Sequence, residues 1–354
     1  MKKVKAMRGF RDRDFLQTRE GFFFCVVGPF HPSDRVISYL KYVPAEFGGW
    51  GKGKKRFRRV MKTYTIPSLL ETFSLLEREY PHYLFDSPVY NIRMTGVRHA
   101  HIAKHFKPEE KLAQLVRTHH PDPLQKKLIR FTSFLAETSK ISVGSFGVTG
   151  SILLDIHHPE FSDLDVTIYG LKNSLTVKNA LTTENILSNP AIQRFEGGIL
   201  TAWCEAKARN YPLTVDEALQ IYERKWNIGL FENTRFSLHP VRLEQELSEK
   251  YGDKTHYPVE TIIVRAVVCE SADPMFLPAV YSIRDVEVVE GPLVSDIEEV
   301  ISYESLYDNL AEVGEAIEAR GKLERVLDTK TGREYHRVLV GSPEGKGREY
   351  IKLN

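Results

Sequence analysis

Residues 146–170 read FGVTGSILLDIHHPEFSDLDVTIYG, and their pattern is the most informative one in the chain. An apolar segment ends in Gly150 and Ser151, eleven residues follow, and Asp163 and Asp165 then introduce a second apolar segment. Short apolar runs bounded by turn residues are typical of buried strands. The pattern therefore predicts a glycine-containing turn, a short helix, and a strand over residues 163–169.

Gly150 and Ser151 are suited to hold the phosphates of a nucleotide. Glycine has no Cβ, so a phosphate can approach its backbone closely. We expect Ser151 to be the N-cap of a helix over residues 152–156, whose free N–H groups and positive dipole end favour an anion. The Ser151 hydroxyl would add one more donor.

Asp163 and Asp165 are the expected catalytic residues and metal ligands. Alternate side chains of a strand share a face, so the two aspartates and Thr167 would point one way while the apolar residues between them pack on helices. Two neighbouring carboxylates repel each other unless a cation lies between them. Mg²⁺ or Mn²⁺ binds such carboxylates together with phosphate oxygens, and two ions together promote in-line displacement at phosphorus.

This arrangement resembles the signature of the polymerase-beta-like nucleotidyltransferase superfamily: an apolar residue, Gly-Ser or Gly-Gly, about a dozen residues, then Asp-x-Asp or Asp-x-Glu. Residues 146–170 also look like archaeal proteins known chiefly as predicted nucleotidyltransferases. The likeness is strong over this motif and loose over the surrounding α/β segment. It implies a metal-dependent enzyme that transfers a nucleoside monophosphate from an NTP such as ATP to an acceptor hydroxyl.

The sequence departs from that superfamily at one point. A third carboxylate usually comes from a later strand beside the first, but the expected strand, Thr234–Val241, contains no acid. His239 stands where the acid is sought, so it is either a metal ligand or a structural histidine. Arg235 would share its face and is the first candidate to bind the triphosphate. Other candidates are Glu244, Glu246 and Asp155 for the missing acid, and Lys225 and Arg242 for the phosphate-binding cation.

The rest of the chain predicts three regions. Residues 1–65 form a basic, β-rich segment, residues 66–250 a helical lead-in (66–141) followed by the nucleotidyltransferase core, and residues 258–354 a β-rich domain resembling a small barrel. The expected fold is thus an α/β (α+β) core with small β-rich domains at both ends. Expected helices cover 67–79, 108–118 and 123–140; expected strands include 22–27, 36–42, 259–269, 280–289, 316–327 and 334–340.

The N-terminal segment has the charge of a polyanion-binding surface. Residues 1–62 contain 16 Lys and Arg against five acids, a net charge of +11, although the whole chain carries only +2. Trp50 and Phe57 stand among the charges, a mixture that suits phosphate contact and base stacking. A flexible basic hairpin tip is the alternative interpretation. The expected nucleic-acid contacts are Lys52, Lys54, Lys55, Arg56, Arg58 and Arg59.

Composition excludes several classes of protein. Of the 354 residues, 42% are hydrophobic and 27% charged, which is typical of a folded globular chain. The longest apolar stretch, residues 21–30, is about half the roughly 20 residues that a bilayer crossing needs. Cys25, Cys204 and Cys269 show no CxxC spacing, which argues against a cysteine zinc site and favours the cytoplasm.

Two alternative functions remain open from the sequence. The missing third acid suits a nucleotidyltransferase fold that has lost catalysis and binds nucleic acid, and compact relatives can modify a protein rather than RNA. A separate weak signal is the pair His101 and His105, which would share one face of a helix. Because Ile102 occupies the place of the glutamate in the His-Glu-x-x-His pattern, we expect a basic helical surface there.

Overall fold

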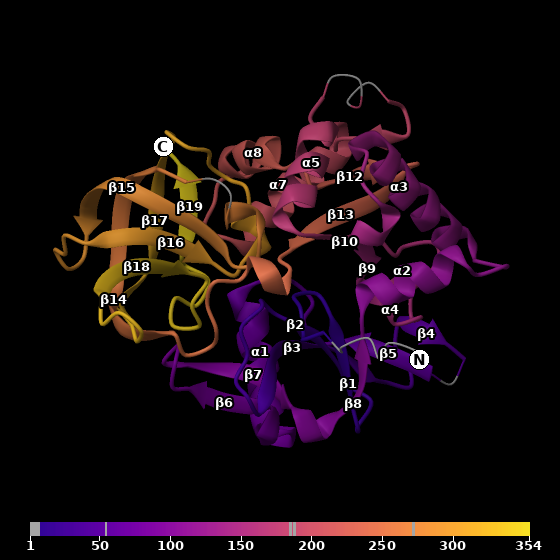
Figure 1. Cartoon of the computed structure of the whole chain (residues 1–354), viewed down its shortest axis with the longest axis horizontal. Helices are drawn as coiled ribbons and strands as arrows, with labels where there is room; N and C mark the ends of the chain where they lie inside the picture. The colour runs from indigo at the N-terminus through magenta and orange to yellow at the C-terminus, as the bar shows by residue number, and fades with distance from the viewer. Residues whose placement is uncertain (1–7, 54, 184–185, 187–188, 271–272) are drawn as a thin grey trace.

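The computed structural model of the chain describes residues 8–53, 55–183, 186, 189–270 and 273–354. They form a mixed α/β protein built on three sheets (Figure 1). In that view the N-terminal sheet lies at the bottom, the central sheet and its helices at the upper right, and the C-terminal strands at the left. No helix among the described residues is both long and apolar enough to cross a membrane.

The N-terminal region is one sheet that continues past residue 65. Its strand order is β4-β5-β3-β2-β1-β8, and β7 pairs with both β3 and β6. The elements are β1 (Phe15–Thr18), β2 (Phe23–Val26), β3 (Arg35–Pro44), β4 (Trp50–Lys52), β5 (Lys55–Arg59), α1 (Ile66–Glu79), β6 (Leu84–Ser87), β7 (Ile92–Arg98) and β8 (Ile102–Phe106).

The expectation of a helical region throughout 66–141 is wrong for residues 84–106. These residues form three strands, because the edges of β1 and β3 offer unpaired backbone groups that β8 and β7 complete. His101 and His105 therefore do not share a helical face. His101 ends a single 3-10 turn, and His105 lies on β8.

The central region contains a five-stranded sheet of order β11-β12-β13-β10-β9. β10 runs parallel to β13 and antiparallel to β9. The elements are α2 (Pro108–Val116), α3 (Pro123–Ser139), β9 (Phe146–Val148), α4 (Gly150–Leu153), β10 (Leu164–Tyr169), α5 (Leu171–Leu181), β11 (Ile192–Gln193), α7 (Gly197–Asn210), α8 (Val215–Arg224), β12 (Ile228–Phe231) and β13 (Thr234–Val241).

The apolar face of β10 anchors the motif in the core, as the alternation predicts. Leu164, Val166 and Ile168 are fully buried and pack in one cluster with Leu128 and Phe131 of α3. Each such side chain contributes about 1.5–3 kcal/mol by leaving water. This packing fixes the register of β10, so that the alternate side chains, among them Asp165, lie on the other face.

The C-terminal region is a closed barrel of five strands. β14 pairs with β15 and β17, and the ring continues through β16 and β18 back to β17, with β19 added outside the ring. The elements are β14 (Lys254–Val268), β15 (Ala279–Glu290), β16 (Ile297–Ser302), β17 (Ala316–Asp328), β18 (Glu334–Val340) and β19 (Tyr350–Leu353). The barrel-like C-terminal domain is thus confirmed.

Candidate active site

The turn between β9 and α4 brings the backbone against the aspartates. Gly150 has a φ of +67°, and a Cβ at this position would collide with the Asp165 carboxylate. Both facts require glycine here. The prediction that Ser151 is the N-cap is wrong, because Thr149 holds that position. The Thr149 hydroxyl donates to the Arg13 carbonyl at 2.7 Å instead of capping the helix. Ser151 lies buried in the first turn.

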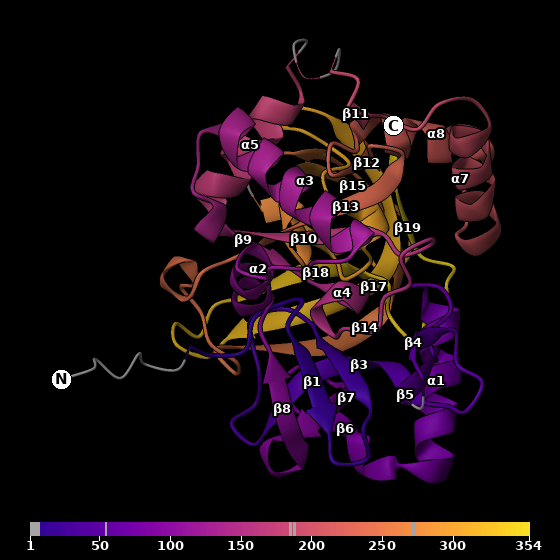
Figure 2. The ribbon, with the colours of Figure 1, turned by 90° about the vertical axis from the view of Figure 1, so that its right-hand side faces the viewer.

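α4 is a single turn of four residues. Its dipole is correspondingly small, so an anion there would depend on the N–H groups of the first turn rather than on a long helix. The turn lies at the boundary between the central sheet and the N-terminal strands, and the two views agree on this placement (Figure 2). The site is therefore built from both regions.

Asp165 is half-buried and held by β13. Ser237 Oγ donates to Asp165 Oδ1 at 2.6 Å, and His239 Nε2 lies 3.9 Å from the same oxygen. Burial alone would raise the pKa of the Asp165 carboxyl. The interaction with His239 and the positive charge of Lys41 outweigh burial and hold that pKa well below its usual range. The Asp165 carboxylate is therefore ionised at neutral pH.

Asp163 has the opposite electrostatic character. It directly precedes β10 and is exposed to solvent, and its carboxylate makes no hydrogen bond with the other described residues. Desolvation by neighbouring atoms and the negative charge of Asp165 raise the pKa of Asp163 to about 6. A cation placed between the two carboxylates would relieve this repulsion.

A hydroxyl occupies the position beside Asp165. In the parallel pairing of β10 with β13, Asp165 lies opposite Ser237 and Thr167 lies opposite His239. His239 accordingly stands one pair further along, although its Nε2 lies 2.9 Å from Ser237 Oγ. Burial lowers the pKa of His239, which leaves its imidazole neutral and able to bind a metal ion.

The acids that were candidates for the third ligand are engaged elsewhere. Glu244 pairs with Arg11, whose Nε lies 2.9 Å from Oε1. Glu246 accepts hydrogen bonds from backbone N–H groups at the start of α5 and in the loop after β13. Asp155 pairs with Lys111 of α2 at 2.6 Å. These contacts join the three carboxylates to residues other than Asp163 and Asp165.

Of the candidate phosphate-binding cations, Arg235 acts on Asp163 and Lys225 is engaged elsewhere. Arg235 is exposed on β13, lies 5.5 Å from the Phe195 ring centroid, and lowers the pKa of Asp163 through its charge. Lys225 is buried and forms an ion pair with Asp308 of the barrel region. Lys225 therefore joins two regions of the protein and is not available to a phosphate.

Two cations of the N-terminal sheet also act on the aspartates through their charge. The charges of Arg59 on β5 and Lys41 on β3 both lower the pKa of Asp163. Lys41 is buried. Burial alone would lower the pKa of Lys41, but Tyr64 and the other groups around it raise it.

The sequence interpretation assigned Arg59 to nucleic-acid binding and missed Lys41. One signal was available, because Lys41 is the only charged residue in the largely apolar segment of residues 36–43. A lysine is rarely buried without a partner or a function, so an isolated one in an apolar strand marks a candidate site residue.

An aromatic surface adjoins these cations. The Tyr64 ring is 40% exposed, with Arg59 Cζ 4.8 Å and Lys41 Nζ 5.3 Å from its centroid. A cavity of about 190 Å³ opens beside it, lined among others by Tyr39 and Arg13. Tyr39 Oη is buried and has no hydrogen-bond partner among the described residues, whereas Arg13 Nε lies 3.3 Å from Asp12 Oδ2 in an ion pair. The cavity thus combines an apolar wall with one buried hydroxyl that a ligand could satisfy.

The basic hairpin β4–β5 is attached to the motif. Gly51 N–H donates to the Ile156 carbonyl at 2.8 Å, and Trp50 packs edge-on against Phe161 at 6.3 Å. These contacts attach strand β4 of the hairpin to the motif. Four of its basic side chains are exposed, Arg59 is half-buried toward the site, and Lys54 lies outside the described residues; the exposed four are Lys52, Lys55, Arg56 and Arg58.

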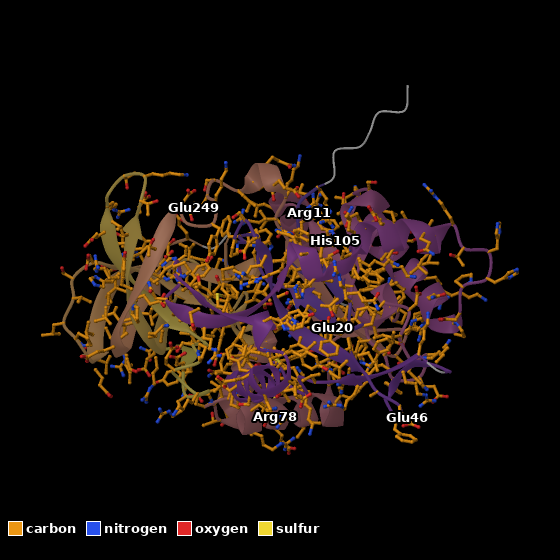
Figure 3. All side chains as sticks on the ribbon, turned by 90° about the horizontal axis from the view of Figure 1, so that it is seen from below. Arg11, Glu20, Glu46, Arg78, His105 and Glu249 are labelled. Atoms are coloured by element: carbon orange, nitrogen blue, oxygen red, sulfur yellow. The ribbon has the colours of Figure 1, made fainter. Side chains whose placement is uncertain are left out.

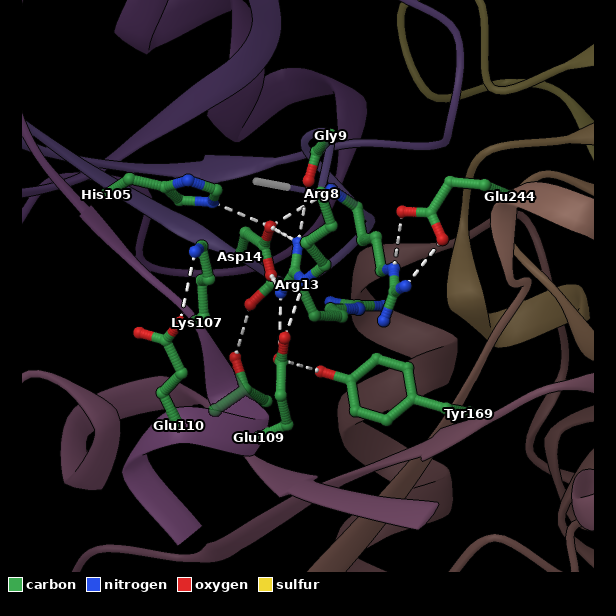
Figure 4. A network of polar contacts seen from close by, with 12 residues as sticks. Arg8, Gly9, Arg13, Asp14, His105, Lys107, Glu109, Glu110, Tyr169 and Glu244 are labelled. Carbon is green, nitrogen blue, oxygen red and sulfur yellow. Dashed lines mark hydrogen bonds and ion pairs between the residues drawn. The ribbon is translucent and has the colours of Figure 1, made fainter. Parts of the chain in front are cut away.

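A buried polar network fixes the N-terminal sheet to the central region (Figure 4). Arg8 bonds both Asp14 and Glu109 of α2, and Glu109 also accepts from the Tyr169 hydroxyl at 2.9 Å. His105 Nε2 lies 2.8 Å from Asp14. Because Tyr169 ends β10, this network holds the cations of the N-terminal sheet at a defined distance from the aspartates.

A larger cavity, of about 630 Å³, lies where the three regions meet. Its walls include Arg11, Glu244 and Tyr303, but none of the motif residues Gly150, Ser151, Asp163 and Asp165. Size alone therefore does not locate the chemistry, and the aspartate pair remains the better-defined candidate site.

The chain is similar to an archaeal protein along almost its whole length. It is 28% identical over 345 residues to the uncharacterized protein MJ1086 of Methanocaldococcus jannaschii, covering 97% of this chain and 98% of that protein. The likeness spans all three regions and is not confined to the motif. No protein-family model matches the chain, and no solved structure matches it.

Proposed function

We propose that the protein is a metal-dependent nucleotidyltransferase that moves a nucleoside monophosphate from an NTP to an acceptor hydroxyl. The observation that carries the proposal is the close approach of Gly150 to Asp165, with Asp163 two residues away on the same edge. The Asp165 carboxylate fills the space that a Cβ would take, so phosphate oxygens would have to bind through the backbone N–H groups of this turn, beside the two acidic groups. Positioning and charge neutralisation supply most of the catalysis in such transfers.

Asp163 and Asp165 fit the ligand set of Mg²⁺ or Mn²⁺, and His239 is a candidate third ligand. Asp163 is accessible and destabilised by its neighbour, and Asp165 is already ionised. When bound, the ion would stabilise negative charge on the phosphate and lower the pKa of the attacking hydroxyl. Ser237 would orient Asp165 through its hydrogen bond.

The cations on the opposite wall would hold the triphosphate. Lys41 and Arg59 come from the N-terminal sheet and Arg235 from β13, and the charge of each acts on Asp163. A polyphosphate between them and the aspartates would be neutralised from two sides. The exposed ring of Tyr64 and the adjacent cavity offer the nucleoside a stacking surface.

The acceptor we favour is RNA. The exposed cations of the β4–β5 hairpin lie next to the motif, where Gly51 bonds Ile156. Of the two aromatic residues expected to stack on bases, Phe57 is buried against Phe23, so only Trp50 is partly accessible. A surface of exposed Lys and Arg suits a phosphate backbone regardless of sequence. A protein acceptor is the alternative product of the same chemistry.

A second candidate function rests on Ser237. The superfamily usually supplies an acid from the strand beside the aspartates, but the hydroxyl of Ser237, which lies opposite Asp165, cannot serve as a third anionic ligand. A fold that binds nucleic acid without turnover would fit this substitution. Its activity would be RNA binding that weakens steeply with salt, with no metal-dependent consumption of NTP.

Labelled NTPs distinguish these functions. The chain is incubated with Mg²⁺ or Mn²⁺, α-labelled NTPs and either RNA or extracted protein, and the labelled product is separated. Asp163→Asn and Asp165→Asn should abolish labelling, whereas Glu160→Gln, an exposed acid in the same motif, should retain it. Labelled protein in place of RNA would identify the alternative acceptor. RNA binding without any labelled product would overturn catalysis and support the second function.

A further inference from the structure

Three metal-binding side chains gather at the end of the N-terminal sheet away from α4. Glu20 lies in the turn between β1 and β2, His82 in a 3-10 turn after α1, and His101 in a 3-10 turn between β7 and β8. One ligand atom from each lies within 4.8 Å of the other two. Figure 3, which looks at the molecule from below, labels Glu20 on the N-terminal region.

We propose that Glu20, His82 and His101 bind a divalent transition-metal ion, with Zn²⁺ as the best match. Two imidazoles and one carboxylate form a donor set that suits Zn²⁺, whereas Mg²⁺ prefers oxygen ligands alone. The site is chemically distinct from Asp163 and Asp165. It also does not depend on nucleotidyl transfer, because none of its residues contacts the motif.

The surroundings orient the carboxylate for this role. Tyr83 is fully buried, and its hydroxyl donates to Glu20 Oε2 at 2.6 Å. That bond leaves Glu20 Oε1 directed toward the histidines, 3.8 Å from His82 Nε2. A fixed partner on the second oxygen is the usual way in which proteins position a ligating carboxylate.

The two imidazoles need only a small movement to complete the site. Their ring centroids lie 5.0 Å apart, with the planes inclined by 45°. With Zn–N and Zn–O distances of about 2.0–2.2 Å, ligand atoms around a tetrahedral ion lie about 3.3–3.6 Å apart. The ligand atoms, now within 4.8 Å of one another, must therefore approach by up to about 1.5 Å. The side chains of Glu20 and His82 are 31% and 37% exposed and can move this far without disturbing the core.

The ion would join three segments that are distant in the sequence. It would connect the β1–β2 turn, the end of α1 and the β7–β8 connection, and so stabilise the sheet that carries Lys41 and Arg59. Three protein ligands leave one position of a tetrahedral ion for water. We therefore assign the site a stabilising role with one open coordination position.

Zn²⁺ titration of the full chain tests the proposal. Calorimetry with Zn²⁺ in the presence of excess Mg²⁺ should show one equivalent bound, and Co²⁺ should give the visible absorption of a four-coordinate ion. His82→Ala and His101→Ala should each weaken binding by at least 100-fold and abolish the Co²⁺ spectrum, and Glu20→Gln should weaken it by about tenfold or more. The matched control is His119→Ala, at an exposed loop histidine remote from the cluster, which should bind as the parent does.

Three results would overturn the site. The first is no binding at micromolar Zn²⁺ by a parent chain with native circular dichroism. The second is binding that survives both His82→Ala and His101→Ala, and the third comes from a variant of the aspartates. The double variant Asp163→Asn, Asp165→Asn separates the two proposals, since it should lose transfer yet keep the Zn²⁺ equivalent. If it lost that equivalent, the bound ion would belong to the aspartates.

Discussion

Ser237 Oγ donates a hydrogen bond of 2.6 Å to Asp165 Oδ1 from the position directly opposite it on the parallel strand β13. The same hydroxyl lies 2.9 Å from His239 Nε2. Ser237 thus links the ionised aspartate to a neutral histidine. If Asp163 and Asp165 bind a metal ion as proposed, an acid at position 237 would add a third negative charge beside Asp165.

Adding that charge should strengthen metal binding. In Ser237→Asp a third carboxylate would stand beside Asp165, so we expect the Mg²⁺ concentration for half-maximal transfer to fall about tenfold, equal to about 1.4 kcal/mol. Without metal the same variant should melt at a lower temperature, because three carboxylates would repel one another. The control is Ser237→Asn, of equal size but uncharged. Equal Mg²⁺ dependence in the two variants would contradict this role for the position.

The raised pKa of Asp163 predicts a pH-dependent penalty on folding. The pKa of Asp163 is about 6 in the folded protein and lower in the unfolded chain. At pH values between these two pKa values, the folded protein therefore binds more protons than the unfolded chain. Stability therefore falls as pH rises from about 4 to 6, and the full penalty persists at higher pH. Because Asp163 is exposed, solvent screening reduces this penalty to about 1 kcal/mol.

Asp163→Asn should remove that penalty. In metal-free buffer the variant should melt above the parent at pH 8 and together with it below pH 4. Saturating Mg²⁺ should stabilise the parent and shrink the difference at pH 8. Thermal unfolding at these pH values, with and without Mg²⁺, provides the measurement; a variant less stable than the parent at pH 8 without metal would refute the repulsion between the two acids.

Gly150→Ala should damage both folding and transfer. The added Cβ would meet the Asp165 carboxylate, and the φ of +67° is unfavourable for alanine. We expect a loss of about 1–3 kcal/mol in the free energy of unfolding, together with loss of transfer. Gly144→Ala is the matched control, because its Cβ would touch only Ser142 Oγ at 3.4 Å. In chemical denaturation, only Gly150→Ala should have a lower free energy of unfolding than the parent.

The local part of the site was predictable, because it depends on neighbours in the sequence. The order of turn, helix and strand follows from Gly150 and from the alternation after Asp163, and the burial of the apolar face confirms the predicted side-chain directions of β10. The N-cap was wrong by two residues. Thr149 and Ser151 are both good caps, and only the contact of Thr149 with Arg13 distinguishes them.

The register of β13 could not be read from the sequence. A strand repeats every two residues, so Ser237 and His239 lie on the same face, and pattern alone does not tell which one stands beside Asp165. The buried contacts of the whole sheet fix the answer.

The grouping of Lys41 and Arg59 near the aspartates could not be predicted from the sequence for another reason. Lys41 and Arg59 precede the aspartates by more than a hundred residues, and tertiary contacts such as Gly51 with Ile156 bring them close. Strands β6–β8 were missed on similar grounds. Their short, mixed sequences become strands because β1 and β3 present edges for pairing.

Lys41→Met should impair use of the NTP. Loss of this buried charge removes a cation that acts on both aspartates, so we expect the KM for NTP to rise about tenfold or more and the pKa of Asp163 to move further up. Lys62→Met, at an exposed position that follows strand β5, is the control. Steady-state kinetics over a range of pH measures both effects. An unchanged KM would contradict the proposal that Lys41 binds the triphosphate.

The hairpin β4–β5 should contribute the electrostatic part of RNA binding. Each phosphate contact on a single strand lowers the slope of log K against log salt by about 0.7, so Lys55→Ala with Arg56→Ala should reduce the slope by about 1.4. The control double variant is Lys346→Ala with Arg348→Ala, two exposed cations on the barrel region. Fluorescence anisotropy with a labelled RNA at several salt concentrations gives the slopes. Because the hairpin is bonded to the motif through Gly51 and Ile156, RNA held there lies next to Asp163 and Asp165. If the barrel variant lost the slope and the hairpin variant kept it, the acceptor would approach from the other side, and the basic N-terminal segment would have no part in presenting it.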